Sequence, residues 1–134
     1  MYFSISTEER SEEALIAASR EIAERAHKGQ TRDGGEPYFE HPRRVAEYTN
    51  EKFGALAGAE GVAAAYLHDV LEDCGFGHYK EIMDRCGYVV AGLVEILTKP
   101  KERDYRNKRY LCRLTVAPTA ALLVKMSDRR DNLL

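Results

Sequence analysis

Apolar residues recur every three or four positions along most of this chain, which is the period of an amphipathic helix. The clearest stripe runs from Leu15 to Ala26 and follows two glutamates, Glu12 and Glu13, that suit a helix N-terminus. No alternating run of β-branched residues extends beyond a few positions. The pattern therefore predicts an all-α protein.

Glycine and proline residues divide the pattern into about six or seven helices with short connections. The first helix is expected to stop near Lys28, and a glycine-containing loop follows at residues 31–38. Pro42 suits the first turn of the next helix and predicts an extended conformation for His41 at the entrance. The expected helices lie at about 12–28, 42–53, 60–73, 78–86, 88–97 and 101–114, and from 119 onward.

The length and composition predict a single domain. A chain of 134 residues, 44% hydrophobic and 31% charged, can bury one core but not two. We find no internal repeat or linker, so one domain is expected over residues 1–134. No apolar run approaches the length of about 18 residues typical of a membrane span, and residues 1–13 are polar rather than signal-like. These features predict a cytoplasmic protein.

Cysteine usage and charge exclude further classes. Cys74, Cys86 and Cys112 form no Cys-x-x-Cys pair, so they indicate small hydrophobic side chains in a reducing compartment. A net charge of -2 argues against a nucleic-acid partner. Residues 1–97 carry 10 basic and 18 acidic side chains, whereas residues 98–134 carry 10 and 4. The basic segment is either a solvated face or part of a site for a polyanion.

Four ionisable residues interrupt the otherwise apolar helix expected at 60–73, namely His68, Asp69, Glu72 and Asp73. Spacings of three and four positions predict that they share one side of this helix. Three buried carboxylates beside each other are unfavourable unless a positive charge is also present. In the alternative interpretation, Glu72 and Asp73 end the helix in solvent and His68 is a hydrogen-bonded core histidine.

Two further residues favour a functional site over that alternative. His41 lies at a helix entrance after the loop, and Asp128 follows the apolar run at 120–126. Two imidazoles and two carboxylates from three helices suit a divalent metal with nitrogen and oxygen ligands and open positions for water. The sequence therefore predicts a metal site.

Four segments resemble a known family. They are Ala-His-Lys-Gly-Gln-Thr-Arg at 26–32, Gly-Glu-Pro-Tyr-Phe-Glu-His-Pro at 35–42, His-Asp-Val-Leu-Glu-Asp at 68–73 and Val-Lys-Met-Ser-Asp-Arg at 124–129. In this order and spacing they closely resemble the hydrolase domain of the RelA/SpoT family, within the HD superfamily of metal-dependent phosphohydrolases. The resemblance runs from about residue 14 to the last residue and implies a helical HD-domain bundle.

The resemblance implies a manganese centre and a reaction. The family's reaction removes pyrophosphate from the ribose 3′ position of guanosine tetra- or pentaphosphate (ppGpp or pppGpp), the alarmones of the stringent response. The substrate would be this small molecule, with neither nucleic acid nor membrane as partner. By similarity, the Mn²⁺ ligands would be His41, His68, Asp69 and Asp128, and the catalytic pair that activates water would be Glu72 and Asp73.

Substrate contacts are also implied by the resemblance. Arg32 is similar to an arginine that packs on the guanine base, and Asn132 to an asparagine near the ribose. We expect further substrate contacts from Tyr38 and from Arg106 and Arg109 in the basic segment. In the alternative interpretation, the basic segment is solvated surface.

Three departures from the family pattern bear on these expectations. Asp33 replaces a lysine found in many members, which leaves the base preference open, and Cys74 replaces a threonine. The chain stops six residues after Asp128, where the family domain continues. We therefore expect either a domain lacking C-terminal helices or a homo-oligomer that completes the pocket. Two other functions stay open: hydrolysis of another phosphorylated nucleotide, and alarmone binding without catalysis.

Overall fold

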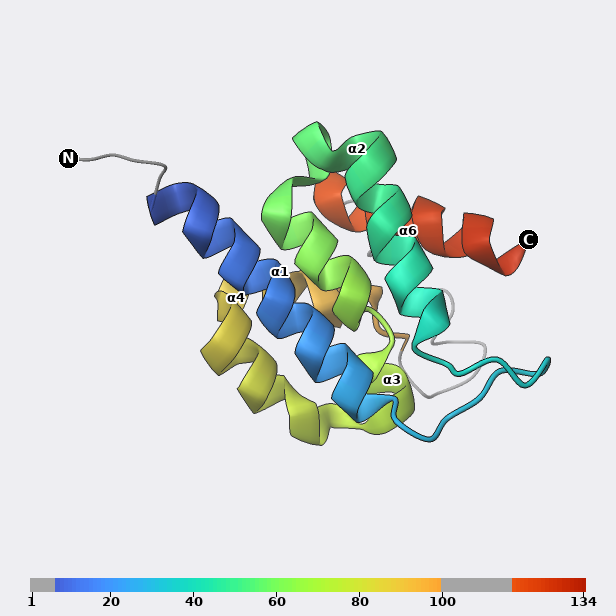
Figure 1. The fold of residues 1–134 in the computed structure, drawn as a ribbon. Coiled ribbons are helices and arrows are strands. Elements are labelled where there is room, and N and C mark those ends of the chain that lie inside the picture. The colour runs from blue at the N-terminus through green and yellow to red at the C-terminus, as the bar shows by residue number, and fades with distance from the viewer. Residues whose placement is uncertain (1–6, 100–116) are drawn as a thin grey trace.

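The computed structural model describes residues 7–99 and 117–134, which form helices joined by loops (Figure 1). Two short elements, α3 (Val70–Cys74) and the 3-10 turn η1 (Phe76–His78), lie between longer helices. Within these ranges the extended backbone pairing is an isolated bridge between Thr31 and Pro37. The all-α prediction is confirmed. The long helices are α1 (Thr7–Ala26), α2 (Glu40–Leu67), α4 (Tyr79–Leu97) and α6 (Thr119–Asn132).

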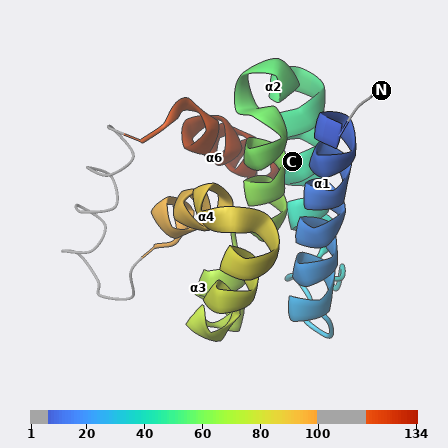
Figure 2. The same cartoon turned by 90° about the vertical axis from the view of Figure 1, so that its left-hand side faces the viewer.

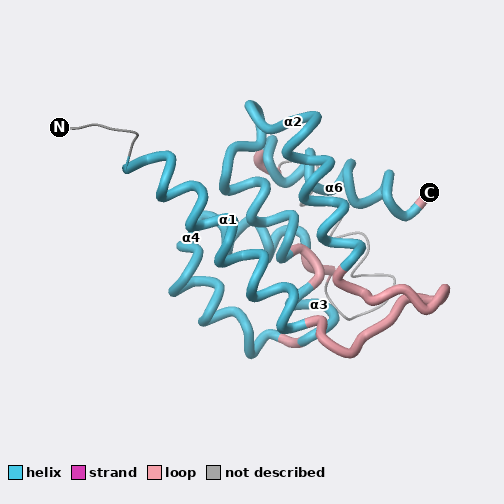
Figure 3. The backbone as a smooth tube through the Cα atoms, in the orientation of Figure 1, coloured by secondary structure: helices cyan, strands magenta, loops and turns pink. Residues whose placement is uncertain are grey.

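Helix α2 is the central element of the bundle. It packs against α1, α4 and α6, and the two perpendicular views show α1 and α6 on different sides of it (Figures 1 and 2). The loop between α1 and α2 is the longest irregular stretch in the described ranges, and Figure 3 shows it extending beyond the helix ends. This loop carries two of the segments on which the family resemblance depends.

One continuous core joins all the long helices. The stripe predicted for the first helix is confirmed, because Ile22 of α1 is completely buried. Leu67, Val90 and Val124 contribute from α2, α4 and α6 and are buried in the same cluster. Each aliphatic side chain of this kind contributes about 1.5–3 kcal/mol when it leaves water. This core fixes the relative positions of the helix ends that carry the ionisable residues.

Two predicted helix boundaries are kinks within longer helices. Residues 42–53 and 60–73 were expected as separate helices, but α2 continues through Gly58, which has φ 69° and ψ 174°. Likewise, α4 continues through Gly87, with φ 89° and ψ 165°. Glycine adopts such angles because it lacks a Cβ. The prediction of separate helices at 42–53 and 60–73, and at 78–86 and 88–97, is therefore wrong. The helix expected at 101–114, which belongs to the predicted six or seven, lies outside the described residues.

Two local predictions near the motifs are also wrong. Helix α2 ends at Leu67 and α3 begins at Val70. The helix expected at 60–73 is therefore broken at His68 and Asp69. His41 belongs to the first turn of α2 and is not extended. Backbone N–H groups in a first turn have no intrahelical acceptor, so Pro42 is accepted there without loss of a hydrogen bond.

The described cysteines are free thiols, and the prediction of a buried cysteine side chain is confirmed for Cys86. Cys86 is a buried free thiol in the core, and Cys74 is a half-buried free thiol. Cys112 lies outside the described residues. Among the helices that the structure describes, none has the length and apolar character needed to cross a bilayer.

Candidate metal centre

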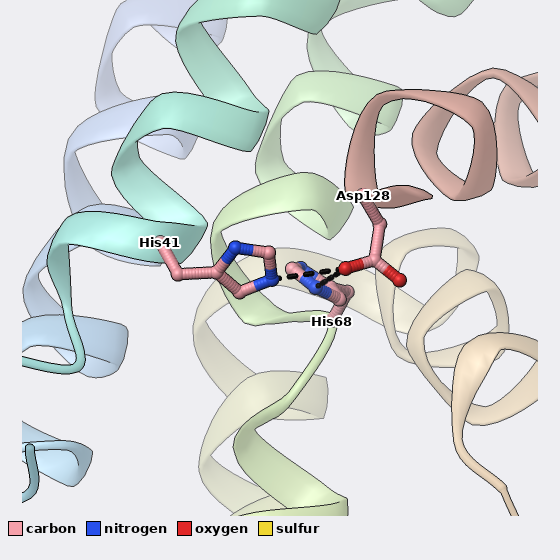
Figure 4. A group of neighbouring side chains, drawn as sticks. All are labelled: His41, His68 and Asp128. Atoms are coloured by element: carbon pink, nitrogen blue, oxygen red, sulfur yellow. Dashed lines mark hydrogen bonds and ion pairs between the residues drawn. The ribbon is translucent and has the colours of Figure 1, made fainter. Parts of the chain in front are cut away.

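Three predicted site residues meet where the first turn of α2, the end of α2 and α6 come together (Figure 4). Nε2 of His41 lies 2.9 Å from Oδ1 of Asp128, and Nε2 of His68 lies 3.3 Å from the same oxygen. One ligand atom from each residue lies within 4.8 Å of the others, and all three residues are buried. The structure thus brings together side chains that are up to 87 positions apart in the chain.

Asp69 joins this group from the break between α2 and α3. Its Oδ2 lies 3.2 Å from Nε2 of His68 and 3.5 Å from Nε2 of His41. Consecutive residues of a regular helix do not face each other. Because α2 ends at Leu67, His68 and Asp69 both reach the same point. All four residues predicted as metal ligands therefore converge, although not on one face of a continuous helix.

Both imidazole rings are held through their outer nitrogen atoms. Nδ1 of His68 lies 2.7 Å from the carbonyl oxygen of Ala65, and a carbonyl oxygen can only accept a hydrogen bond. Nδ1 of His68 therefore carries the proton and donates it to Ala65. Nδ1 of His41 lies 2.8 Å from Oδ2 of Asp131. As a result, both Nε2 atoms face the carboxylates of Asp69 and Asp128.

The buried carboxylates favour a positive charge at this point. Burial by itself lowers the pKa of His68, but the carboxylates of Asp69 and Asp128 outweigh it and hold that pKa well above its ordinary value. Burial also raises the pKa of Asp69, but the nearby His68 outweighs it and lowers that pKa to about 2. Hydrogen bonds from His41 and His68 similarly hold the pKa of Asp128 well below its ordinary value, against the effect of burial.

The donor set fits a divalent metal ion. Imidazole nitrogen and carboxylate oxygen are the ligands expected at a mixed site for a first-row transition metal. The four groups lie at or near the ends of helices, and their carboxylates need a compensating positive charge. His41, His68, Asp69 and Asp128 are thus the residues that could hold such an ion.

A cavity of about 200 Å³ lies beside the four groups. Tyr38 lines it and donates its hydroxyl hydrogen to Oδ2 of Asp69 at 2.8 Å. Burial and the charge of Asp69 strongly raise the pKa of Tyr38, so its hydroxyl remains a donor. Lys125 also lines the cavity, with Nζ 3.2 Å from Oδ2 of Asp128. The ammonium group of Lys125 thus lies at the wall of this cavity.

The predicted catalytic carboxylates have different positions. Glu72 lines the cavity, and its Oε1 accepts a hydrogen bond from the backbone N–H of Lys99 at 2.9 Å. Burial, followed by the charges of Asp69 and Asp73, raises the pKa of Glu72. Asp73 is not among the described residues that line the cavity, although burial and Asp69 raise its pKa as well. The structure therefore brings Glu72, but not Asp73, to the cavity wall.

Arg32 and Asn132 lie together at the edge of the same site. Nη2 of Arg32 donates to Oδ1 of Asn132 at 2.8 Å, and Nδ2 of Asn132 donates to Oδ1 of Asp128 at 3.3 Å. A neighbouring cavity of about 590 Å³ is lined by Arg32, Asp33 and Asn132, so Asn132 borders both cavities. Arg106 and Arg109 lie outside the described residues.

Three residues at the site were missed by the sequence predictions: Arg44, Lys125 and Asp131. Asp131 contacts His41, and its side chain is only 4% exposed. It follows Asp128 by three positions on α6, a spacing that places both carboxylates on one helix face. This spacing was the signal by which Asp131 could have been predicted as a site residue. It was missed because Asp131 lies in a charged run that is typical of solvent-exposed surface.

Comparison of this sequence with known proteins identifies the protein family to which it is similar. The family model described as HD domain matches residues 19–133. A guanosine-3′,5′-bis(diphosphate) 3′-pyrophosphohydrolase from Aquifex aeolicus is 40% identical over 123 residues, which are 87% of this chain and 17% of that protein. The bifunctional (p)ppGpp synthase/hydrolase SpoT of Escherichia coli K12 is 36% identical over 120 residues, covering 84% of this chain and 16% of SpoT.

A solved structure supports the same relationship. It belongs to a metazoan orthologue of SpoT that hydrolyses ppGpp, is 26% identical and superposes with a TM-score of 0.77 over 99% of this chain and 71% of the other. The chain spans about one sixth of the length of the curated relatives named above. The resemblance predicted from the four motifs is confirmed. On the match over residues 19–133 and the shared helical structure, this chain belongs to the HD-domain family.

Proposed function

We propose that this chain is a metal-dependent phosphohydrolase that removes the 3′-pyrophosphate from ppGpp or pppGpp. The observation that carries the proposal is the convergence of His41, His68, Asp69 and Asp128 beside a cavity that also contains Glu72. Relatives that match 84–87% of this chain are named for hydrolysis of this alarmone. We further propose that residues 1–134 form one HD phosphohydrolase domain.

The four converging residues would hold the metal ion, and the family resemblance makes Mn²⁺ our proposal. When bound, a divalent cation lowers the pKa of a coordinated water and offsets negative charge on phosphoryl oxygens. The buried carboxylates of Asp69 and Asp128 supply the negative charge that retains such an ion, and the imidazoles of His41 and His68 would complete the set as nitrogen ligands.

Glu72 is our proposed general base. Its raised pKa brings the carboxylate closer to the working pH, which favours proton transfer, and the N–H of Lys99 fixes one of its oxygens. Glu72 would take a proton from water as the water oxygen bonds to the phosphorus attached to the 3′ oxygen. The bond between that phosphorus and the 3′ oxygen breaks, and the 3′ oxygen leaves as a hydroxyl after taking up the proton that Glu72 received from water. We propose that Asp73 supports Glu72 through its charge.

The nucleoside would occupy the neighbouring cavity. Arg32 and Asn132 line it, and Asn132 also contacts Asp128, so a ligand there would lie next to the metal centre. Tyr38 contacts Asp69 directly, so we place its main interaction at the metal centre rather than with substrate. The predicted contacts of Arg106 and Arg109 with the phosphates remain proposals.

A substrate panel tests the proposal. Purified protein is incubated with ppGpp, pppGpp, GTP and other phosphorylated nucleotides in Mn²⁺, in Mg²⁺ and in chelator, and released pyrophosphate is measured. We expect pyrophosphate and GDP from ppGpp in Mn²⁺ and none in chelator.

The same panel decides between the alternatives. Turnover of other nucleotides without turnover of ppGpp would favour a different nucleotide hydrolase, for which Asp33 beside Arg32 is the supporting observation. Binding of ppGpp with no hydrolysis in any metal would favour a non-catalytic binding module.

A further inference from the structure

We infer that Asp131 is a positioning residue that orients His41 for cation binding, and that Arg44 anchors the Asp131 carboxylate. This inference rests on the proposed metal site and extends it to two residues outside the family motifs. Asp131 does not line the cavity of about 200 Å³ beside the four groups, although Asp131 and Arg44 both line the neighbouring cavity. Asp131 acts on the metal centre through the ring of His41.

Both oxygens of Asp131 are engaged. Oδ2 lies 2.8 Å from Nδ1 of His41 and also accepts hydrogen bonds from Arg44 Nη2 at 3.1 Å and Arg32 Nη1 at 3.3 Å. Oδ1 accepts a hydrogen bond from Nε of Arg44 at 2.7 Å. A buried carboxylate with this many donors has one available orientation. Asp131 therefore forms a rigid acceptor on the side of the ring that faces away from the centre.

Each ring nitrogen of His41 faces a carboxylate. Asp131 lies at Nδ1, and Asp128 lies 2.9 Å from Nε2. If the proton is on Nε2, that nitrogen has no lone pair for a metal ion. A fixed acceptor at Nδ1 retains the proton there and leaves Nε2 able to bind a cation. Outer partners of this kind typically change metal affinity by about 10–100-fold.

Arg44 supplies the charge that allows Asp131 to be buried. Besides its two bonds to Asp131, it forms two bonds to Glu36, from Nη1 at 2.8 Å and from Nη2 at 2.9 Å. An isolated buried carboxylate is costly, and a fixed guanidinium offsets that cost. The arginine thus links the loop before α2 to the outer side of the His41 ring.

A purely structural role for Asp131, as a contact between α2 and α6, makes a different prediction. The same two helices share another buried polar contact, in which Thr49 Oγ1 lies 3.0 Å from Ser127 Oγ. Thr49→Val removes this contact without touching His41. It is therefore a matched control for a loss of helix packing.

Mn²⁺ titration calorimetry on the full chain tests the inference. Asp131→Asn should weaken Mn²⁺ binding by about 10–100-fold, whereas Thr49→Val should lower the melting temperature and leave the affinity unchanged. Arg44→Gln, which keeps the carboxylate but removes its anchor, should weaken binding in the same direction and serves if Asp131→Asn does not fold. Wild-type affinity in a folded Asp131→Asn, or equal losses in it and Thr49→Val, would overturn the inference.

A second measurement needs no metal. In ¹⁵N-labelled, metal-free protein at alkaline pH, the ring nitrogens of His41 should report a proton on Nδ1 in wild type and a shift towards Nε2 in Asp131→Asn. An unchanged proton position would refute the positioning role. If wild type binds no Mn²⁺, but the ring proton of His41 still moves from Nδ1 in wild type towards Nε2 in Asp131→Asn, the proposed function fails while the role of Asp131 stands.

Discussion

The kink of α4 at Gly87 predicts opposite effects for two similar substitutions in one helix. Gly87 has φ 89° and ψ 165°, angles that a residue with a Cβ adopts only under strain. Gly92 belongs to the same helix, and a Cβ added at either position meets no heavy atom within 4 Å. The difference between the two alanine variants is therefore backbone strain and not steric overlap. The kink matters for the site because α4 leads to Lys99, whose N–H holds Glu72.

Comparing Gly87→Ala with Gly92→Ala gives the expected changes in the free energy of unfolding. Both substitutions remove the same glycine freedom from the unfolded chain, which alone stabilises by about 0.4–1 kcal/mol. At Gly92, in helical backbone, Gly92→Ala should therefore raise the free energy of unfolding by about 0.5–1 kcal/mol. At Gly87 the strain of about 1–3 kcal/mol opposes that gain, so Gly87→Ala should lower the free energy of unfolding.

Urea unfolding of the two variants and wild type measures these differences. The two alanine variants should differ by about 1–3 kcal/mol, with wild type between them. If both variants are more stable than wild type by similar amounts, α4 passes through Gly87 as a regular helix, and the reasoning is refuted.

Three further predictions concern the site and its surroundings. Asp69→Ala should contain less Mn²⁺ than wild type after dialysis, because it removes one of four converging ligand groups; equal content by metal analysis would exclude Asp69 as a ligand. Glu72→Gln should bind Mn²⁺ normally but hydrolyse ppGpp about 10²–10⁴-fold more slowly, and an unchanged rate would remove Glu72 from the mechanism. His27 is buried, its Nε2 has no hydrogen-bond partner among the described residues, and burial lowers its pKa. The unfolded ring binds a proton near pH 6.5, so this histidine makes stability fall as pH decreases from there through the lower folded pKa. His27→Gln should reduce that pH dependence in denaturant titrations, and an equal dependence would contradict the assignment.

The sequence predicted which residues form the site better than it predicted the local backbone. Ionisable residues set next to apolar segments indicated a site, and the resemblance to the family implied that His41, His68, Asp69 and Asp128 are its ligands. The helix break after His68 was not predicted, because Leu-His-Asp-Val contains neither glycine nor proline. Nothing local requires the break, and it is instead supported by tertiary contacts of His68 with Asp128 and of Asp69 with Tyr38.

Gly58, Gly87 and Asp131 show what local patterns omit. The sequence predicted interruptions between residues 53 and 60 and between residues 86 and 88, but whether a helix stops or bends at such a point depends on how its second half packs against the core. Asp131 occurs in the polar run Asp-Arg-Arg-Asp-Asn at 128–132 and resembles a solvent-exposed residue by sequence. Its burial depends on Arg44 and His41, which are about 90 positions away in the chain.

That separation gives the site a consequence for folding. Since His41 and Asp128 come from distant parts of the chain, their ligand atoms approach only after α6 has docked on α2, and the site reports completed tertiary structure. A cation held there would connect the two helices as a reversible cross-link. At 100 times its dissociation constant it would add about 2.7 kcal/mol to the free energy of unfolding. Metal supply would then control the stability of the folded chain as well as its chemistry.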